Sequence, residues 1–438
     1  MMNSLKSIIR NFYQKTPWLF RIDAFFTQRM QGVQSAENQC DGNQETDRYD
    51  IQNLGELLQF LDHTEAKVYG REIIEGYEEH ADQSVLLVSH ELSFSGAPIV
   101  LLRLAESLKR RGFQTVIICG RDGEIFADHA TRMGIPVVCY PGLLESGMVF
   151  CIRKLFSRII VNTIRCASVI NQLNDTDSSV MWWIHEAGAC YQRSTAREMP
   201  YQVTENIHIY SCGSYAGKML VSRFPRYSVK NLTAGVPDLA KADNKSDFHL
   251  DLPDKKIFAL FGAVEYRKGQ DVLKNAIKRL PERIRKECFF LFVGRDSDPK
   301  ITSALRELNY QYPENVLYID EIKYNDMCRL YRDIHFLVCA SRDDPTPLVV
   351  AESMSLGKPC ICSEHTGAAA VIEKYNAGYV YRHNSAPALA QRIEEAYYLN
   401  IENYETMSKN ARSAFEQVFS EELFEEKLDQ CLEKMKND

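Results

Sequence analysis

Short continuous apolar runs alternate with segments of helical periodicity from Ser84 almost to the end of this 438-residue chain. No other feature of the sequence constrains the fold as strongly. Runs such as Val85–Val88 and Val180–Ile184 are apolar at every position, which is typical of parallel strands covered by helices on both faces. Segments such as Ile99–Leu108 have helical periodicity instead. Alternating strand and helix predicts a doubly wound α/β sheet.

The alternation falls into two series, separated by the polar segment 238–256, which has the composition of an interdomain linker. In the first series, strands are expected at Val85–Val88, Thr115–Cys119, Val137–Cys139, Ile159–Val161, Val180–Ile184 and Ile207–Tyr210. In the second, they are expected at Ile257–Phe261, Phe289–Val293, Val316–Ile319, Phe336–Cys339, Pro359–Cys362 and Tyr379–Tyr381. Two such series predict two Rossmann-like domains facing a central cleft, which is the default place for a binding site.

We therefore expect three regions, and at about 150 residues per domain the chain is long enough for them. A helical and polar N-terminal extension over residues 1–82 precedes a Rossmann-like domain over 83–240. A second Rossmann-like domain covers 241–438, and its last helix is expected to complete the first domain. The extension has a helical stretch around Leu54–Leu61 but is otherwise polar and acidic over residues 36–82. We interpret it as an extension and not as a third catalytic domain.

Residues 1–30 combine five basic residues with interleaved aromatic residues and a single acid, Asp23. Leu5, Ile8 and Phe12 recur at helical spacing, and Pro17 is expected to divide the segment into two short helices. One interpretation is a helix that packs on the main body of the protein or on a partner. The other is an interfacial helix that makes peripheral contact with an anionic membrane surface.

Charge and cysteine content narrow the partners and the location of the protein. The net charge is −7 and the pI is about 5.9, so nucleic acid is not an expected partner. None of the 13 cysteines forms a CxxC pair, and we expect reduced, buried thiols in a cytoplasmic protein. No apolar run approaches the ~18 residues that a membrane span needs, and the start lacks the apolar core of a signal peptide. If residues 1–30 bind lipid, the location becomes peripheral on the inner membrane face.

Two loops that each follow a strand and open a helix could bind an anion. In the first, Ser95 is an expected N-cap and Pro98 suits the first turn, so free N–H groups near Gly96 favour an anion. A plain strand–helix turn is the alternative. In the second, the adjacent cations Arg267 and Lys268 follow a strand, and fixed positive charge of this kind suits a diphosphate. We expect Lys268 to be an exposed phosphate ligand, the alternative being two ordinary surface cations.

The segment from Asp344 to Glu352 gives the most specific signal. Thr346 is the expected N-cap of a helix whose first residue is a proline, which leaves the N–H groups of Leu348 and Val349 free to bind phosphate. Asp344 and Glu352 bracket this helix start, and carboxylates can accept sugar hydroxyls while the helix end binds phosphate. That division suits a nucleotide sugar. The alternative is an acidic first turn that only complements the helix dipole.

A further candidate is the pair His185-Glu186, which follows the expected strand Val180–Ile184. A histidine at the carboxyl end of a strand can face the cleft, and a purely structural histidine is the alternative.

Taken together, these features resemble the family-4 glycosyltransferases, retaining enzymes of GT-B architecture, from about Ser84 to the C-terminus. The matching elements are an acid pair separated by seven residues (Asp344 and Glu352), Lys268-Gly269 after a strand, a glycine loop at Ser95-Gly96, the pair His185-Glu186, and Gly235-Val236-Pro237-Asp238 before the linker. The resemblance implies that Asp344 contacts the transferred sugar, Glu352 the ribose and Glu186 the acceptor, with His185, Asp344 and Lys268 as the catalytic set. The implied donor-binding residues are Gly96, Arg267, Lys268, Asp344, Thr346, Leu348, Val349 and Glu352.

The resemblance further implies transfer of a hexose, with retention, from a nucleotide diphosphate sugar to a glycan or lipid-linked glycan. The expected setting is cell-envelope polysaccharide biosynthesis. No cofactor and no catalytic metal are expected. No residue clearly serves as an enzymic nucleophile. The resemblance implies a front-face reaction in which the leaving phosphate takes the acceptor proton.

Four departures separate this chain from the family pattern. Ala263 stands where the family often has arginine, and the first acid is Asp344, one methylene shorter than the family's glutamate. Pro345-Thr346-Pro347 replaces Gly-Phe-Gly, and Thr366-Gly367-Ala368-Ala369-Ala370 replaces a Gly-Gly…Glu element. They leave two alternatives open. One is a GT-B enzyme of another reaction, such as a sugar-nucleotide epimerase or a phosphorylase. The other is a catalytically silent subunit that scaffolds a glycan-assembly complex.

Overall fold

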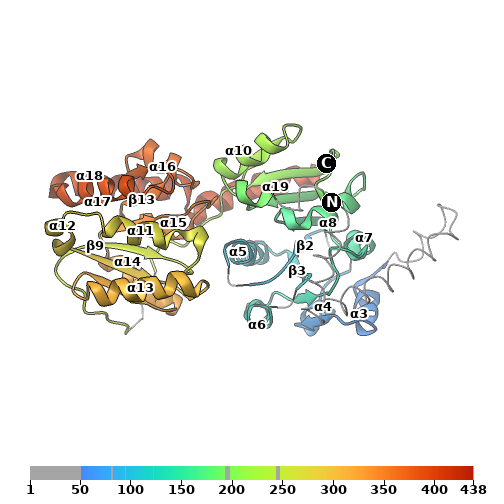
Figure 1. Ribbon diagram of the computed structural model, residues 1–438. Coiled ribbons are helices and arrows are strands. Elements are labelled where there is room, and N and C mark those ends of the chain that lie inside the picture. The colour runs from blue at the N-terminus through green and yellow to red at the C-terminus, as the bar shows by residue number, and fades with distance from the viewer. Residues whose placement is uncertain are drawn as a thin grey trace, which may run out of the picture. The chain divides into compact units, whose positions relative to one another are not determined.

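The computed structural model describes residues 51–79, 82–93, 95–121, 123–192, 198–242 and 247–437. Residues 52–438 form one compact unit, built on two α/β sheets (Figure 1). The hypothesis of a membrane-binding helix in residues 1–30 falls outside the described residues. Among the helices that are described, none is both long and apolar enough to cross a membrane.

The first sheet has eight strands in the order β1-β4-β3-β2-β5-β6-β7-β8, all parallel except the antiparallel edge strand β1. The strands are β1 (Lys67–Tyr69), β2 (Ser84–Ser89), β3 (Gln114–Cys119), β4 (Val137–Cys139), β5 (Arg158–Asn162), β6 (Val180–Ile184), β7 (Ile207–Ser211) and β8 (Val229–Asn231). The helices and helical turns of this region are α3 (Leu54–Asp62), α4 (Arg71–Glu75), α5 (Gly96–Arg110), α6 (Glu124–Arg132), α7 (Met148–Ile152), η2 (Arg153–Leu155), η3 (Ile164–Cys166), α8 (Ala167–Leu173), η4 (Gly188–Gln192) and α10 (Ser214–Arg223).

The second sheet has six parallel strands in the order β11-β10-β9-β12-β13-β14. They are β9 (Lys256–Phe261), β10 (Cys288–Val293), β11 (Val316–Ile319), β12 (Phe336–Cys339), β13 (Cys360–Ser363) and β14 (Gly378–Tyr381). The helices and helical turn that accompany it are η5 (Tyr266–Lys268), α11 (Gln270–Ile277), α12 (Glu282–Glu287), α13 (Pro299–Gln311), α14 (Tyr324–Asp333), α15 (Leu348–Ser355), α16 (Ala369–Tyr375), α17 (Ala386–Tyr398) and α18 (Ile401–Val418).

Both sheets reverse their strand order at one point, between β2 and β5 in the first and between β9 and β12 in the second. In doubly wound sheets, ligands bind outside the carboxyl ends of the strands at this switch point. The loops that carry Gly96 and Lys268 follow β2 and β9, and the loop that carries Asp344 follows β12. The fold therefore places three of the predicted loops where ligand sites form in such sheets.

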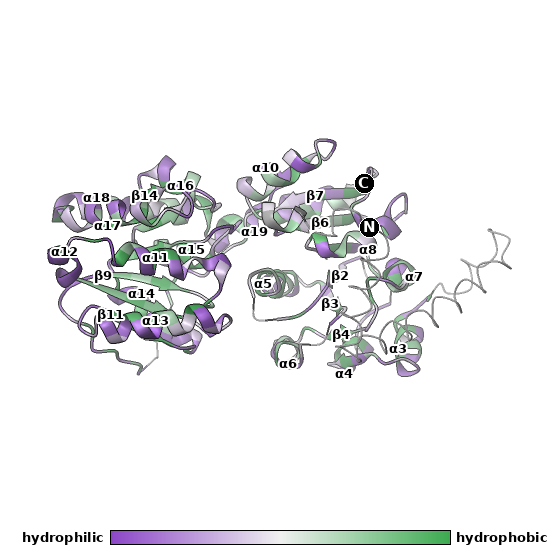
Figure 2. Ribbon diagram, in the orientation of Figure 1, coloured by the Kyte–Doolittle hydropathy of each residue, from purple (hydrophilic) through white to green (hydrophobic). Residues whose placement is uncertain are grey.

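The expectation of a doubly wound α/β fold is confirmed, and the buried strands explain why. The residues of β2 and β10 are buried at every position, and Figure 2 shows hydrophobic colour along the strands of both sheets. Among the described residues, apolar side chains form a core on one face of the first sheet and one on each face of the second. Leu86, Ile159 and Trp182, on the other face of the first sheet, are fully buried as well. Burial of both faces requires apolar residues throughout a strand.

The C-terminal helix α19 (Glu421–Asn437) belongs to the core of the first sheet, although it follows the second sheet in the chain (Figure 1). Phe424 stacks on Trp183 with the ring centroids 6.0 Å apart. Leu428 and Leu432 are buried in the same cluster. Arg111 of the α5 C-cap forms ion pairs with Glu425 and Asp429, which hold the polar side of α19.

Part of the predicted N-terminal extension lies in the first sheet. The pairing of β1 with β4 adds residues 67–69 to that sheet, and Tyr69 packs against its core. The boundary expected at residue 82 followed a change in composition. Composition does not reveal this contact, because β1 is only three residues long and partly exposed.

Candidate active site

The loop after β9 brings two cations to the switch point of the second sheet. It passes through η5 and ends at Gly269, whose φ of +71° is left-handed. Lys268 donates from Nζ to Oδ2 of Asp344 at 2.7 Å, and Arg267 donates from Nη1 to the same oxygen at 3.4 Å. Arg267 also pairs with Glu265 at 2.8 Å. The predicted basic pair therefore lies against the first acid of the predicted acid pair.

Gly269 allows this loop to approach the end of β12. A Cβ atom built on Gly269 would lie 2.1 Å from the carbonyl oxygen of Ala340, far inside van der Waals contact. The left-handed φ is a second reason for glycine, because other residues are strained there. The position thus fixes where Lys268 points.

Replacing Gly269 with alanine is expected to lower the free energy of unfolding by about 3 kcal/mol, through backbone strain and the clash with Ala340. Gly142 provides a matched control, since its φ is +78° and a Cβ there meets no atom within 4 Å. Gly142→Ala should cost about 1 kcal/mol, the strain alone. Urea denaturation of both variants measures the difference, and equal losses would show that the Ala340 contact is not tight.

Asp344 is a buried carboxylate, only 5% exposed. Its backbone N–H donates to the carbonyl of His365, and Ser341 Oγ donates to Oδ2 at 3.4 Å. Burial raises the pKa of this carboxyl, but the charges of Lys268 and Arg267 outweigh burial and leave the pKa below its ordinary value. Asp344 is therefore ionised at neutral pH. Both cations donate to its Oδ2 atom and neither donates to Oδ1.

The expectation that Lys268 is exposed is wrong, while its predicted role as a phosphate ligand stays a prediction. The side chain is 20% exposed and ion-paired, because Gly269 holds the loop against β12, where the Asp344 carboxylate lies. An ammonium group has three N–H donors. Lys268 can therefore hold Asp344 with one donor and bind another anion with the others.

The expected N-cap of α15 is also wrong by one residue. The helix begins at Leu348, Pro347 occupies the cap position, and no side chain caps the helix. Thr346 instead donates from Oγ1 to the carbonyl oxygen of Cys212 at 3.0 Å, after β7 of the first sheet. The Cys212 carbonyl therefore binds the hydroxyl that was expected to cap the helix. In the part of the chain that the structure describes, the N–H groups of Leu348 and Val349 have no hydrogen-bond acceptor, as was expected.

Two of the segments that depart from the family pattern pack against each other. Gly367 donates its N–H to the carbonyl of Asp344 at 2.9 Å, and Asp344 forms an isolated bridge with Thr366. A Cβ at Gly367 would lie 1.7 Å from the carbonyl oxygen of Pro345. The glycine retained in the altered Thr366–Ala370 element thus supports the segment that carries Asp344.

Glu352, the second acid, is held by two tyrosines that sequence reasoning missed. Tyr331 donates from Oη to Oε2 at 2.7 Å, and Tyr324 donates to Oε1 at 3.1 Å. Both belong to α14, seven residues apart, which places them on one helix face. The seven-residue spacing is visible in the sequence, but the sequence does not indicate that these two tyrosines contact Glu352.

The pair His185-Glu186 follows β6 in the first sheet. Burial lowers the pKa of His185 to about 3, so its imidazole is neutral at physiological pH, and its Nε2 atom is buried without a partner. Burial raises the pKa of Glu186 to about 7, opposed by the N–H groups of Ile164 and His185 that donate to its Oε2 atom. Both groups thus differ from ordinary surface residues.

The first sheet and the second sheet approach each other around Cys212. Burial, supported by the charges of Glu186 and Asp344 and opposed by the hydrogen bond with Thr346, raises the pKa of the Cys212 thiol to about 12. Tyr215 of α10 donates to Oδ1 of Asp343 at 3.3 Å. Glu186, after β6 of the first sheet, and Asp344, after β12 of the second, therefore both act on Cys212.

Gly96 begins α5, and the cap residue Ser95 makes no side-chain hydrogen bond to the helix. A Cβ built on Gly96 meets no atom within 4 Å. The position is therefore open to a group that approaches the helix start.

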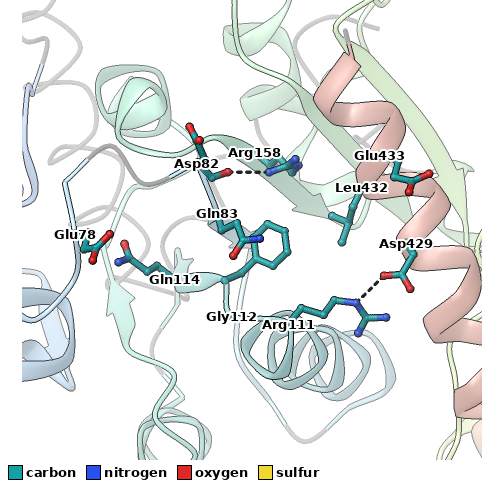
Figure 3. Close-up of a pocket in the computed structure, with 11 residues that line it drawn as sticks. Glu78, Asp82, Gln83, Arg111, Gly112, Gln114, Arg158, Asp429, Leu432 and Glu433 are labelled. Carbon is teal, nitrogen blue, oxygen red and sulfur yellow. Dashed lines mark hydrogen bonds and ion pairs between the residues drawn. The ribbon is translucent and has the colours of Figure 1, made fainter.

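A cavity of about 740 Å³ lies elsewhere, at the amino ends of β2, β3 and β5 (Figure 3). Arg111 pairs there with Asp429, and Arg158 donates to the carbonyl of Asp82. None of the predicted site residues lines this cavity. Ligand sites of doubly wound sheets lie at the opposite, carboxyl edge. Among the described residues, no group of three or more His, Cys, Asp or Glu is placed to hold a metal ion.

Comparison with known proteins decides the family. Residues 242–414 match the family described as "Glycosyl transferases group 1", and residues 81–210 match that described as "Glycosyl-transferase family 4". The chain belongs to the family-4 glycosyltransferases. It is a glycosyltransferase of GT-B fold, as expected from the sequence.

Individual relatives of this glycosyltransferase are distant. Spore coat protein SA of Bacillus subtilis (strain 168) is 26% identical over 271 residues, which cover 57% of this chain and 71% of that protein. The D-inositol 3-phosphate glycosyltransferase of Xylanimonas cellulosilytica is 26% identical over 151 residues, which cover 34% of this chain and 36% of that enzyme.

Solved structures share the fold of this glycosyltransferase. HepE of Anabaena, solved in complex with UDP, aligns with a TM-score of 0.66 at 16% identity, covering 80% of this chain and 100% of HepE. Sucrose-phosphate synthase of Thermosynechococcus elongatus aligns with a TM-score of 0.65 at 18% identity, covering 81% and 99%. At these identities, the likeness concerns the fold.

Proposed function

We propose that this glycosyltransferase moves a hexose, with retention, from a UDP-sugar to a glycan or lipid-linked glycan in cell-envelope polysaccharide biosynthesis. The observation that carries the donor class is the arrangement at the second switch point. There the cations Arg267 and Lys268 follow β9, buried Asp344 follows β12, and buried Glu352 lies in α15, whose start is uncapped. HepE, a structural neighbour, was solved with UDP and with UDP-glucose.

Each group in this arrangement has a place on such a donor. Lys268 and the N–H groups of Leu348 and Val349 bind the diphosphate and stabilise the charge that grows on it as the sugar leaves. Asp344 accepts hydroxyls of the sugar, and Glu352 accepts those of the ribose. Because Lys268 touches both Asp344 and the diphosphate, it fixes the sugar relative to its leaving group.

The acceptor is assigned to the first sheet. Glu186 contacts an acceptor hydroxyl there, and neutral His185 offers its unpartnered Nε2 atom to a hydroxyl of the sugar or acceptor. A neutral imidazole cannot act as a fixed cation, so charge stabilisation remains with Lys268 and Arg267. Free phosphate oxygens of the leaving group then take the acceptor proton. No cofactor and no metal enter this proposal.

A donor panel tests the proposal directly. Purified protein is incubated with UDP-, GDP- and ADP-hexoses, and slow hydrolysis or transfer is followed by release of the nucleoside diphosphate. We expect turnover of a UDP-hexose and an α-configured first product from an α-configured donor, read by NMR. Nucleotide binding without any turnover would support a silent scaffold subunit, and a 2-epimerised sugar nucleotide would support an epimerase.

The membrane contact of residues 1–30 is a separate prediction. Deleting them should reduce pelleting with vesicles that contain anionic lipid and leave turnover of the donor nearly intact, because the donor site lies in the second sheet. Salt weakens such contacts, so the comparison is made at low and high ionic strength. Equal pelleting of both proteins at low salt would exclude this role.

A further inference from the structure

Glu352 is a buried carboxylate that forms no ion pair with a cation among the described residues. It is 6% exposed, and no Lys, Arg or His nitrogen of the described residues lies within 4.0 Å of its oxygens. Asp344, the other buried acid of the site, has two cations instead. Burying a charge is costly unless hydrogen bonds compensate it. The two tyrosine hydroxyls on Glu352 are therefore the groups that make this buried carboxylate possible.

The two tyrosines are held very differently. Tyr331 is fully buried and packs edge-on against Phe261 of β9, with ring centroids 4.9 Å apart and an interplanar angle of 89°. Tyr324 is 48% exposed and is the first residue of α14. Its hydrogen bond to Glu352 is also longer, 3.1 Å against 2.7 Å. Tyr331 is fixed by packing, whereas Tyr324 is partly exposed at the start of α14 and makes the longer of the two hydrogen bonds.

Both phenols keep their protons. Burial, and next the charge of Glu352, raise the pKa of Tyr324 and of Tyr331 above the ordinary value. Each hydroxyl is thus a donor to the carboxylate. A ribose hydroxyl is a donor of the same kind and can replace one of them without leaving the carboxylate uncompensated.

On the proposed donor assignment, we infer that the two tyrosines have separate roles in ribose recognition. Tyr331 is a positioning residue that fixes Oε2 and orients Glu352. Tyr324 donates a hydrogen bond to Oε1 while the site is empty, and a ribose hydroxyl replaces this hydrogen bond when the nucleotide binds. Exchange of one hydroxyl for another spares the ligand the cost of uncovering a buried charge.

The test compares UDP with 2′-deoxy-UDP by calorimetry, and the ratio of their dissociation constants reports recognition of the ribose hydroxyl. A general structural defect weakens both ligands and leaves the ratio unchanged. In the unsubstituted protein, loss of a hydrogen bond to a charged group should weaken binding about tenfold or more. Glu352→Gln should reduce this ratio severalfold. Tyr310→Phe is the control, because Tyr310 is 90% exposed.

Tyr331→Phe is expected to reduce the ratio about threefold or more and to lower the melting temperature, since Oε2 loses its donor. Tyr324→Phe is expected to tighten UDP binding about threefold and to increase the ratio, because the ribose no longer displaces a hydroxyl. If Tyr331→Phe does not fold, the ratios of dissociation constants measured for Tyr324→Phe and Glu352→Gln still test the inference.

Two results would overturn the inference while leaving the donor proposal intact. In one, UDP binds but none of the three variants changes the ratio, so Glu352 does not meet the ribose. In the other, Tyr324→Phe weakens UDP as Tyr331→Phe does, so Tyr324 stays on the carboxylate in the complex. Failure of the unsubstituted protein to bind either nucleotide would instead reject the UDP-sugar assignment itself.

Discussion

Replacing Lys268 with alanine is expected to lower kcat/KM for the nucleotide-sugar donor by about 10- to 100-fold. The reason is that Lys268 would lose a charge-assisted hydrogen bond to the diphosphate, and such bonds contribute roughly 1.5–3 kcal/mol. The same substitution also removes the 2.7 Å partner of buried Asp344. The free energy of unfolding should therefore fall by about 2 kcal/mol, since Arg267 and Ser341 are more distant partners of this carboxylate.

The pH dependence of stability separates this loss from a general packing defect. The native pKa of Asp344 is depressed, so its ionised form contributes stability that is present above the ordinary value of 3.8 and is lost as pH falls through the lower native value. In Lys268→Ala, that pKa rises. The difference in unfolding free energy between the unsubstituted protein and Lys268→Ala should be largest at pH 7 and should decrease below pH 3.8. Denaturant titrations at several pH values measure it.

Lys286→Ala is the matched control. Lys286 also pairs with a carboxylate, Glu282, at 2.7 Å, but both side chains are 69% exposed. Exposed pairs contribute little to stability, so turnover and unfolding should barely change. If Lys268→Ala behaved like this control in nucleotide affinity, the assignment of Lys268 to the diphosphate would be wrong.

The sequence was sufficient to predict the strands that are buried on both faces. In the second sheet, β11 and β12 have the predicted bounds, β9, β10 and β14 begin one residue earlier, and β13 is shifted by one residue toward the C-terminus. The edge strands β1 and β8 were missed, because each has three residues and at least one exposed face. A short strand with a solvated face has no continuous apolar run. Only its pairing with a neighbouring strand identifies it, and that strand lies elsewhere in the chain.

In the candidate site, local chemistry was predictable and long-range partners were not. Lys268-Gly269 and Asp344 could be singled out from the residue types and their spacing, but not the ion pair between them across 76 residues. Thr346 was expected to cap α15 because a threonine there usually does. Its actual acceptor, the Cys212 carbonyl, lies 134 residues away in the chain. A hydroxyl takes the acceptor that tertiary packing brings nearest, and sequence spacing does not report that.

Replacing Asp344 with asparagine should have the largest effect on turnover and little effect on the bare nucleotide. Asparagine keeps the shape of the side chain but removes the charge that Lys268 and Arg267 neutralise and weakens the acceptor proposed for the sugar. We expect kcat for the full donor to fall about 100-fold or more, which is the size of loss seen when one electrostatic contact to a reacting group is removed. Affinity for UDP alone should not weaken, because both cations then face the diphosphate without a competing carboxylate.

The contrast with Glu352→Gln makes this prediction specific. Glu352 is assigned to the ribose, so its substitution should weaken UDP even when no sugar is attached, whereas Asp344→Asn should act only when the sugar is present. Calorimetry with UDP beside turnover of the complete donor distinguishes the two. Equal loss of UDP affinity in both variants would mean that the carboxylates do not divide the donor between sugar and ribose. In that case, the shared effect would come from the negative charge of both acids near the start of α15. Solvent screens this charge poorly, because Asp344 and Glu352 are only 5% and 6% exposed.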